Sequence, residues 1–355
     1  MSDKVLMKGN EAIAEAAICA GCRHYFGYPI TPQTEVAAYM AKKMPKIGGT
    51  FLQAESEIAA INMVYGVSST GHRVMTSSSS PGISLKSEGL SYLAGADLPA
   101  LVVNVQRGGP GLGGIQPSQS DYFQATRGGG HGDYHMVVFA PASVQEMASL
   151  TVRGFEVADK YRVTSMILAD GTMGQMMEPV DLSSLKSEYN PEKPWATTGT
   201  GKKREHNIVN SLYLKPEELE KTNFERYERY KKIEENETLY EEYLMDDAEI
   251  CVAAFGIAAR VSKNAINEAR KEGIKVGLIR PITLWPFPKA PFEKAANKVK
   301  TFISVELSMG QMIEDVRLST HDKANYMLCN RVGGMIPSPD EVLSAIRNAA
   351  KGGKN

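Results

Sequence analysis

The chain has 355 residues, which is the length of about two or three domains. Its 43% hydrophobic and 23% charged residues are ordinary for a globular protein, and a formal net charge of −1 would attract neither nucleic acid nor an anionic membrane. The sequence has no apolar run of the ~20 residues that cross a bilayer and no signal-peptide core at its N-terminus. We therefore expect a cytoplasmic protein that binds neither nucleic acid nor membrane.

Short apolar runs alternate with helical patterns through the first half of the chain. This alternation predicts an α/β fold, with a parallel sheet covered by helices on both faces. Ligands of such sheets bind beyond the carboxyl ends of the strands, where we expect the loops 27–32, 76–82 and 107–117 to lie. Strands are predicted at 50–53, 73–77, 98–105, 136–140 and 164–169, and helices at 10–22, 33–44, 56–67, 84–95 and 143–160.

The composition changes after residue 185. Residues 217–242 are rich in Glu, Lys and Tyr, which indicates one or two exposed helices that serve either as a connector or as a partner-binding arm. A β-α-β-α-β pattern follows, with strands at 250–255, 275–279 and 301–305 and a first helix at 258–272. We expect a first domain over 1–185, a charged helical connector over 186–247 and a second α/β domain over 248–355.

The four cysteines do not form a recognisable cluster motif. Cys19 and Cys22 make a lone C-x-x-C, whereas Cys251 and Cys329 are isolated. A redox pair or half of a metal site is one interpretation. We favour the interpretation that they are packing residues, because free cysteines are often buried and an iron–sulfur cluster usually needs four suitably spaced thiolates.

Two segments place polar side chains at the start of a predicted helix. Thr31 stands between the two prolines of GYPITP at 27–32, where it either caps the helix or contacts an anion or carbonyl oxygen of a ligand. Glu55 and Glu57 lie at a strand-to-helix junction, where the helix dipole favours a carboxylate. Glu57 precedes a helix that should be buried, so it is a stronger functional candidate than a solvated cap.

Three further segments carry polar or flexible residues after strands. TSSSSPG at 76–82 predicts a turn rich in hydroxyls, which either binds a ligand or is merely solvated. Arg107 opens a run too dense in glycine for a dinucleotide fingerprint, but its guanidinium could bind a carboxylate through two donors. Asp170-Gly171 is interpreted as a turn, because the other residues of a thiamine-enzyme metal motif are missing. The loop residue His131 is more often a bystander than a ligand contact.

Taken together and in order, these segments resemble the alpha subunits of 2-oxoacid:ferredoxin oxidoreductases, most closely the 3-methyl-2-oxobutanoate (2-ketoisovalerate) type. The similarity spans nearly the whole chain. The matching segments are KGNEA at 8–12, GYPITP at 27–32, QAESEIAA at 53–60, TSSSSPG at 76–82, KSEGLSYLAGADLP at 86–99, NVQRGGPG at 104–111, RPITLWPFP at 280–288 and VELSMGQM at 305–312.

The resemblance implies a thiamine pyrimidine-binding domain followed by a transketolase C-terminal-like domain. It implies that a 2-oxo acid, CoA and oxidised ferredoxin give acyl-CoA, CO₂ and reduced ferredoxin. Thiamine diphosphate would be shared with a beta subunit that holds the diphosphate and Mg²⁺, a ferredoxin-like delta subunit would carry iron–sulfur clusters, and a gamma subunit would complete the complex. No metal is then expected in this chain. The alternatives are a 2-oxoglutarate or pyruvate enzyme, a non-oxidative thiamine enzyme subunit, or a non-catalytic scaffold.

The resemblance also assigns roles to individual residues. Glu57 matches the glutamate that hydrogen-bonds the aminopyrimidine ring, and its spacing to Gly66 fits the helix of such domains. Thr31 matches a residue that touches substrate or cofactor, and Arg107 matches the one that binds the substrate carboxylate. By analogy, cofactor-binding roles are also assigned to Pro29, Ser78, Ser79 and Ser80. No further cation near these motifs suits a second carboxylate, which favours a branched-chain oxo acid.

Overall fold

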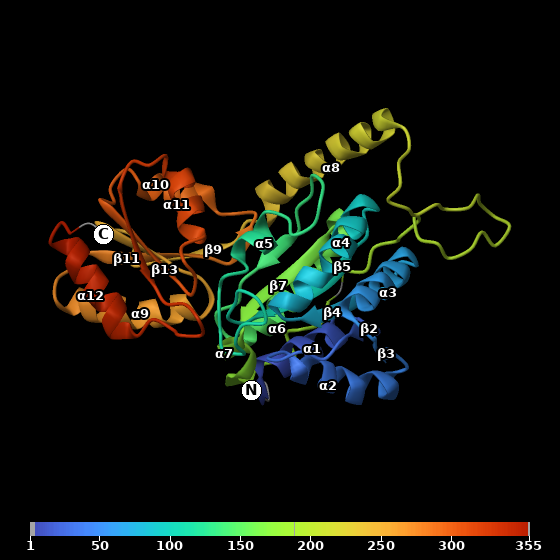
Figure 1. The fold of residues 1–355 in the computed structure, drawn as a ribbon, viewed down its shortest axis with the longest axis horizontal. Helices are drawn as coiled ribbons and strands as arrows, with labels where there is room; N and C mark the ends of the chain where they lie inside the picture. Colours follow the sequence, from blue (N-terminus) through green and yellow to red (C-terminus); the bar gives the residue numbers. More distant parts are fainter. Residues whose placement is uncertain (1–3, 188, 354–355) are drawn as a thin grey trace.

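The computed structural model describes residues 4–187 and 189–353. Two α/β halves lie side by side, and the long helix α8 (Pro216–Glu237) runs along the first half, with one end projecting beyond it (Figure 1). Among the described residues, no helix combines the length and the apolarity that a membrane span requires.

The first half is built on a seven-stranded sheet in the order β12-β6-β7-β5-β4-β2-β3. All neighbouring strands are parallel except β12, which pairs antiparallel with β6. The central strands β5 and β7 are buried along their whole length, which explains their nearly continuous apolar sequences. The strands are β2 (His24–Gly27), β3 (Thr50–Gln53), β4 (Val74–Ser78), β5 (Ala100–Gln106), β6 (Val137–Phe139), β7 (Thr164–Asp170) and β12 (Thr283–Trp285).

Helices cover both faces of this sheet. Leu101 and Val103 of β5 share a core with α1, α2 and α6, whereas the intervening Val102 belongs to a second core with α3 and α4. This alternation follows from the two-residue repeat of a strand. The helices of this half are α1 (Gly9–Cys19), α2 (Thr34–Lys43), the 3₁₀ turn η1 (Met44–Ile47), α3 (Glu57–Ser69), α4 (Ser80–Gly95), α5 (Tyr122–Thr126), α6 (Val144–Tyr161) and α7 (Gly171–Gln175).

The second half has a five-stranded sheet in the order β14-β13-β10-β11-β9. Its elements are β9 (Tyr240–Tyr243), β10 (Ile250–Ala253), α9 (Gly256–Lys271), β11 (Val276–Pro281), α10 (Lys289–Ala295), β13 (Thr301–Glu306), α11 (Met312–Thr320), β14 (Asn325–Asn330) and α12 (Pro339–Ala350). Helices α9 and α12 pack on one face, and α10 and α11 pack on the other. A small antiparallel pair, β1 (Val5–Lys8) with β8 (Met177–Val180), lies apart from both sheets.

Two strands connect the halves across the predicted boundaries. Strand β9 lies within the predicted connector but is an edge strand of the second sheet, antiparallel to β11. Strand β12 follows β11 in the chain and returns to the edge of the first sheet beside β6. The charged segment over 217–242 therefore forms one helix and one strand. The division at 1–185, 186–247 and 248–355 stays a prediction.

Several local predictions need correction. Helix α3 does not stop near Gly66 but runs to Ser69, and the glycine with the left-handed conformation that follows a helix is Gly71, with φ of 82°. Helix α4 begins at Ser80, four residues before its predicted start, because Pro81 fits the first helical turn, where an N–H is not needed. The serine-rich segment is therefore partly strand and partly helix rather than a turn.

The cysteines lie where packing residues are expected. All four thiols are free, Cys22 and Cys251 are buried, and Cys19 and Cys329 are half-buried. Burial raises the pKa of the Cys22 thiol to about 12 and that of Cys329 to about 11, so these side chains are held as neutral thiols. The described residues contain no group of three or more His, Cys, Asp or Glu side chains arranged to hold a metal ion.

Candidate active site

Glu57 occupies the first position of α3, which begins after the short segment 54–56 that follows β3. The Ser56 hydroxyl caps this helix by accepting a hydrogen bond from the Ala59 N–H at 3.2 Å, so the Glu57 side chain is not needed as the cap. Glu57 is only 5% exposed, whereas Glu55, two residues earlier, is exposed. No hydrogen-bond partner for the Glu57 carboxylate is found among the residues that the structure describes. It is thus a nearly buried carboxylate whose acceptor capacity is unused by the protein.

Gly82 of α4 makes room for this carboxylate. A Cβ atom at Gly82 would lie 2.5 Å from Glu57 Oε1 and closer still to Ser78 Oγ. The hydroxyls of Ser78 and Ser79 are both buried, and neither has a hydrogen-bond partner in the described part of the chain. Because buried polar groups are nearly always hydrogen-bonded in native proteins, this cluster of unpaired groups marks a place for an external ligand.

A lysine that the sequence analysis did not consider lies behind this cluster. Lys86 is fully buried on α4, and its ammonium donates to Thr76 Oγ1 at 2.9 Å and to the Ser77 carbonyl at 3.1 Å. Burial lowers the pKa of Lys86 to about 7, and the charge of Glu57 acts in the opposite direction. A sequence signal existed, because Lys86 falls on the helical repeat of the buried α4 residues Gly82, Ile83, Gly89, Leu90 and Leu93.

Ser80 joins the serine segment to the arginine loop. Its hydroxyl donates to Asp121 Oδ2 at 2.6 Å and accepts from the Arg107 N–H at 3.0 Å. Asn104 at the end of β5 accepts from the Ser80 N–H at 3.1 Å and donates to the same Asp121 oxygen at 2.9 Å. Burial raises the pKa of Asp121, although both hydrogen bonds counter this effect. The network fixes the start of α4 relative to the loop after β5.

Arg107 and Thr31 are brought together by this arrangement. Arg107 is 7% exposed, and its guanidinium donates to the carbonyls of Thr31 at 2.9 Å and Leu112 at 3.1 Å, while its Nε–H is buried without a partner. Thr31 itself is exposed and does not cap α2, whose N-cap is Gln33. Of the two interpretations of Thr31, the helix cap is therefore wrong. Pro29 is exposed in the same loop.

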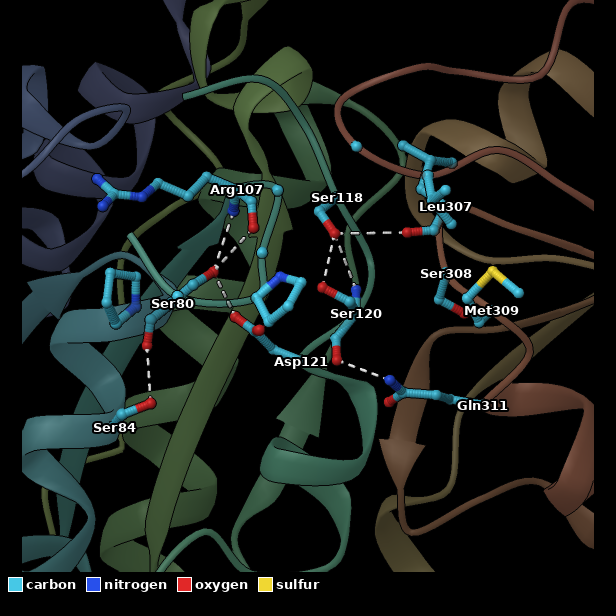
Figure 2. Close-up of a pocket in the computed structure, with 17 residues that line it drawn as sticks. Ser80, Ser84, Arg107, Ser118, Ser120, Asp121, Leu307, Ser308, Met309 and Gln311 are labelled. Atoms are coloured by element: carbon cyan, nitrogen blue, oxygen red, sulfur yellow. Dashed lines mark hydrogen bonds between the residues drawn. The ribbon is translucent and has the colours of Figure 1, made fainter. Parts of the chain in front are cut away.

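A cavity of about 670 Å³ opens beside Arg107, between the loops of the two halves. Ser80, Asp121 and the loop 107–111 form one wall, and Leu307, Met309 and Gln311 belong to the other (Figure 2). The Arg107 guanidinium extends away from the other labelled side chains (Figure 2). The charged end of Arg107 therefore lies on the side of the loop that faces Thr31.

Glu306 shapes the second wall of the cavity. Its fully buried carboxylate accepts hydrogen bonds from the hydroxyls of Ser304 and Ser308, both at 2.7 Å, and from the N–H groups of residues 311–313. The conformation of the loop 307–311 is thus set by one carboxylate at the N-terminus of α11.

Asp170 connects the two halves through its carboxylate. It is not part of a turn, as was predicted, but the N-cap of α7, where Oδ1 accepts from the N–H groups of Thr172 at 2.9 Å and Met173 at 3.0 Å. Its carboxylate also accepts from the Ile257 N–H at the start of α9. Burial raises the pKa of Asp170 to about 6 despite these bonds. The buried carboxylate of Asp170 consequently joins β7 and α7 of the first half to the start of α9 in the second half.

The predicted site residues thus form one connected region. Glu57 and Ser78 meet at Gly82, Ser80 bonds the backbone of Arg107, and Arg107 bonds Thr31. In the described part of the chain, neither the Pro29 side chain nor the Ser79 hydroxyl makes a hydrogen bond to this group. His131 is exposed and contributes its backbone carbonyl to Ser91, which gives it no place in the region. Sequence reasoning missed Lys86, Asn104, Asp121 and Glu306.

Comparisons with known proteins identify the family to which the chain is similar. Residues 15–244 match the family model described as pyruvate flavodoxin/ferredoxin oxidoreductase, thiamine diP-bdg, and residues 248–342 match pyruvate:ferredoxin oxidoreductase core domain II. The chain is 51% identical to the ketoisovalerate oxidoreductase subunit VorB of Methanothermobacter thermautotrophicus, over 97% of each chain. It is 35% identical to the 2-oxoglutarate synthase subunit KorA of Methanothermobacter marburgensis, over 98% of this chain and 99% of that one.

Solved structures show the same architecture. A 2-oxoglutarate:ferredoxin oxidoreductase from Magnetococcus marinus, with 2-oxoglutarate, coenzyme A and succinyl-CoA bound, superposes with a TM-score of 0.87 at 29% identity. That match covers 98% of this chain and 65% of the other. A split gene transketolase superposes with a TM-score of 0.60 at 12% identity, over 97% and 98% of the two chains, which shows the fold alone.

The fold and the matched sequence define the class of protein. The chain belongs to the pyruvate flavodoxin/ferredoxin oxidoreductase family and is a 2-oxoacid:ferredoxin oxidoreductase subunit. The predicted family and α/β fold class are confirmed.

Proposed function

We propose that this chain is the alpha subunit of a thiamine diphosphate-dependent oxidoreductase that converts a branched-chain 2-oxo acid, CoA and oxidised ferredoxin into acyl-CoA, CO₂ and reduced ferredoxin. The observation that carries the proposal is the nearly buried carboxylate of Glu57, which shares a recess with the Ser78 hydroxyl, a buried group without a hydrogen-bond partner among the described residues. The relation to ketoisovalerate oxidoreductases, at 51% identity against 35% for 2-oxoglutarate synthases, supports the substrate class. A 2-oxoglutarate or pyruvate enzyme is the alternative.

The residues around Glu57 fit the aminopyrimidine end of the coenzyme. A carboxylate with free acceptor capacity can take the hydrogen of a ring nitrogen, and the hydroxyls of Ser78 and Ser79 offer further donors or acceptors beside it. The lack of a Cβ at Gly82 keeps this recess open. When bound, thiamine diphosphate supplies the carbon nucleophile that attacks the 2-oxo carbon and accepts the electron pair left when CO₂ departs. Glu57 would hold and return the proton at the aminopyrimidine ring.

Arg107 and Thr31 would place the substrate. The guanidinium has five N–H donors, of which the two protein carbonyls use two, so donors remain for a carboxylate. On the Thr31 side of the loop, a pocket lined by Thr31, Pro32 and Ile115 among others has no lysine or arginine among the described residues that line it. This composition suits an oxo acid with one carboxylate and an aliphatic remainder.

Partner subunits would complete the enzyme in the cytoplasm. On this proposal, a beta subunit holds the diphosphate and Mg²⁺, a ferredoxin-like delta subunit holds the iron–sulfur clusters, and a gamma subunit completes the complex. The exposed positions of Pro29 and Thr31 suit a site whose other wall belongs to a different chain.

Substitution of the glutamate tests the proposal. Glu57→Gln keeps the side-chain shape but removes the proton acceptor, so turnover of the assembled complex should fall by roughly 10²–10⁴-fold. Glu55→Gln is the matched control, because Glu55 is exposed two residues away, and it should keep turnover within about twofold. Full turnover with Gln at position 57 would instead favour the non-catalytic scaffold.

A further inference from the structure

Asn10 has no role in the function proposed above, although it is a fully buried polar residue beside the loop that carries Thr31. It is the second residue of α1, and its amide Nδ2 donates to the Pro32 carbonyl and to Glu35 Oε2, both at 2.8 Å. Because both partners are acceptors, only the NH₂ side of the amide can face them. Asn10 therefore ties α1 to the end of the Thr31 loop and to the first turn of α2.

The other end of the Asn10 amide shows that its two donors are what hold it in place. Its Oδ1 is buried without a hydrogen-bond partner in the described part of the chain. This oxygen lies against α7, so close that a Cβ atom at Gly174 would come within 2.6 Å of it. A buried acceptor without a partner costs free energy, which the two bonds made by Nδ2 must offset.

Gln175 and Lys8 support the same place from its exposed side. Gln175, at the end of α7, donates to the Pro32 carbonyl at 3.3 Å and to Glu35 Oε2 at 2.9 Å. The Lys8 ammonium donates to Glu35 Oε1 and to Gln175 Oε1, both at 3.0 Å. Burial acts to raise the pKa of Glu35, but the hydrogen bonds that it accepts outweigh burial and lower the pKa. We call the two bonds to the Pro32 carbonyl, from Asn10 and Gln175, the Pro32 anchor.

Arg107 bonds the carbonyl of the residue just before the anchored one. Its Nη1 donates to the Thr31 carbonyl at 2.9 Å. The peptide bond is planar and the proline ring fixes φ, so ψ of Pro32 is the one soft dihedral between the Thr31 and Pro32 carbonyls. The Pro32 anchor therefore limits where the Thr31 carbonyl, and with it the Arg107 guanidinium, can lie.

We propose that Asn10 is a positioning residue for the 2-oxo acid, which it serves by fixing the Pro32 carbonyl and, through the Thr31 carbonyl, the guanidinium of Arg107. The inference rests on the substrate role proposed for Arg107. Asn10 is fully buried and so touches neither substrate nor coenzyme. A carboxylate takes two parallel hydrogen bonds only from a correctly oriented guanidinium, and a displacement of about 1 Å in a binding group can cost on the order of 10²-fold.

The test replaces Asn10 in the assembled complex. Asn10→Leu keeps the approximate size and shape of the side chain but has no donor, and Asn10→Ala removes the amide altogether. Asn236→Ala is the matched control, because the exposed Asn236 amide donates to the Lys232 carbonyl one turn earlier in α8. Steady-state kinetics gives kcat and the KM for 2-oxoisovalerate, and a titration gives the coenzyme affinity.

Both Asn10 variants should raise the KM for 2-oxoisovalerate on the order of 10-fold, because the guanidinium is no longer held in one orientation. Their kcat and coenzyme affinity should stay within about threefold of the wild type, since the groups around Glu57 are untouched. Asn236→Ala should leave all three quantities unchanged. A folded Asn10 variant with the KM of the wild type overturns the inference.

A double-mutant cycle with Arg107→Ala separates positioning from a general loss of structure. If Asn10 acts through Arg107, adding Asn10→Leu to Arg107→Ala should raise the KM by less than about twofold further. Effects of the two substitutions that simply multiply overturn the inference. Arg107→Ala with the KM of the wild type would instead overturn the substrate role in the proposed function, whereas an unchanged KM in the Asn10 variants alone leaves that role intact.

Gln175→Met covers the case in which the Asn10 variants do not assemble. It removes the second donor of the Pro32 anchor at an exposed position, where substitutions seldom unfold a protein. It should raise the KM about two- to fivefold, again with no further increase in the Arg107→Ala background. An unchanged KM in Gln175→Met, or an increase that persists in that background, would show that the Pro32 anchor does not orient Arg107 and overturns the inference.

Discussion

At the scale of single residues, Arg107 has guanidinium N–H donors that the protein does not use. Its guanidinium donates to the carbonyls of Thr31 and Leu112, and its Nε–H has no acceptor among the residues that the structure describes. A rigid fork of this kind is prepared for a planar anion, whereas a lysine in the same place would be a point charge on a flexible stem.

Arg107→Ala should therefore raise the KM for the oxo acid on the order of 10- to 100-fold, which corresponds to the loss of a hydrogen-bonded charge pair. Coenzyme affinity should change far less. Steady-state kinetics with the oxo acid, together with a coenzyme titration, measures both quantities. Arg107→Lys should lie between the wild type and Ala. Equal weakening of substrate and coenzyme would remove the role assigned to Arg107.

At the scale of elements, Asp170 joins β7, α7 and α9 through one carboxylate. Burial raises its pKa from 3.8 to about 6 in the folded chain. The folded state therefore binds the proton more tightly than the unfolded state, and stability falls as pH rises from about 4 to about 6. A pKa difference of about two units between the folded and unfolded states corresponds to roughly 3 kcal/mol in the free energy of unfolding.

Asp170→Asn should remove most of that pH dependence. The amide oxygen can still cap α7, since asparagine is as good an N-cap as aspartate. Urea unfolding at a series of pH values between 4 and 7 measures the free energy of unfolding. From pH 4 to pH 7, this free energy should change by roughly 2–3 kcal/mol more favourably in the variant than in the wild type. Asp246→Asn, at an exposed position, should show no such gain. Parallel pH profiles for wild type and Asp170→Asn would contradict the assignment.

At the scale of the whole molecule, two sheets share continuous cores. Each of the two hydrophobic cores includes residues from both halves, and β9 and β12 link the connector and the second half to sheets distant in sequence. The halves are thus expected to move as one body, and the loops at their carboxyl ends keep a fixed spacing around the cavity.

The proposed assembly predicts the behaviour of the complex. Co-expressed with its partner subunits, the chain should purify in a brown complex, because the iron–sulfur clusters of the delta subunit absorb visible light. The chain alone should be colourless, since its four free cysteines do not form a cluster motif. Viologen reduction with 2-oxoisovalerate should be faster than with 2-oxoglutarate or pyruvate. A colourless but active complex would favour a non-oxidative thiamine enzyme, and a preference for 2-oxoglutarate would correct the substrate class.

The sequence by itself determined most strands and helices of the two sheets and pointed to the segments of the candidate site. These features are local: short continuous apolar runs predicted β5 and β7, and a 3.6-residue apolar repeat predicted α6, all to within about two residues. The stop at Gly66 and the turn at Asp170 failed because a glycine is tolerated within a packed helix and because an aspartate that ends a strand can also cap the next helix.

Tertiary structure alone decided which polar groups are paired. That Glu57 is buried while Glu55 is exposed depends on Gly82 of another helix. The contact of Lys86 with β4 and the bond from Asp170 to α9 depend on the order in which strands lie in the sheets. Charge compensation and desolvation act through space, so no periodicity along the chain could reveal them.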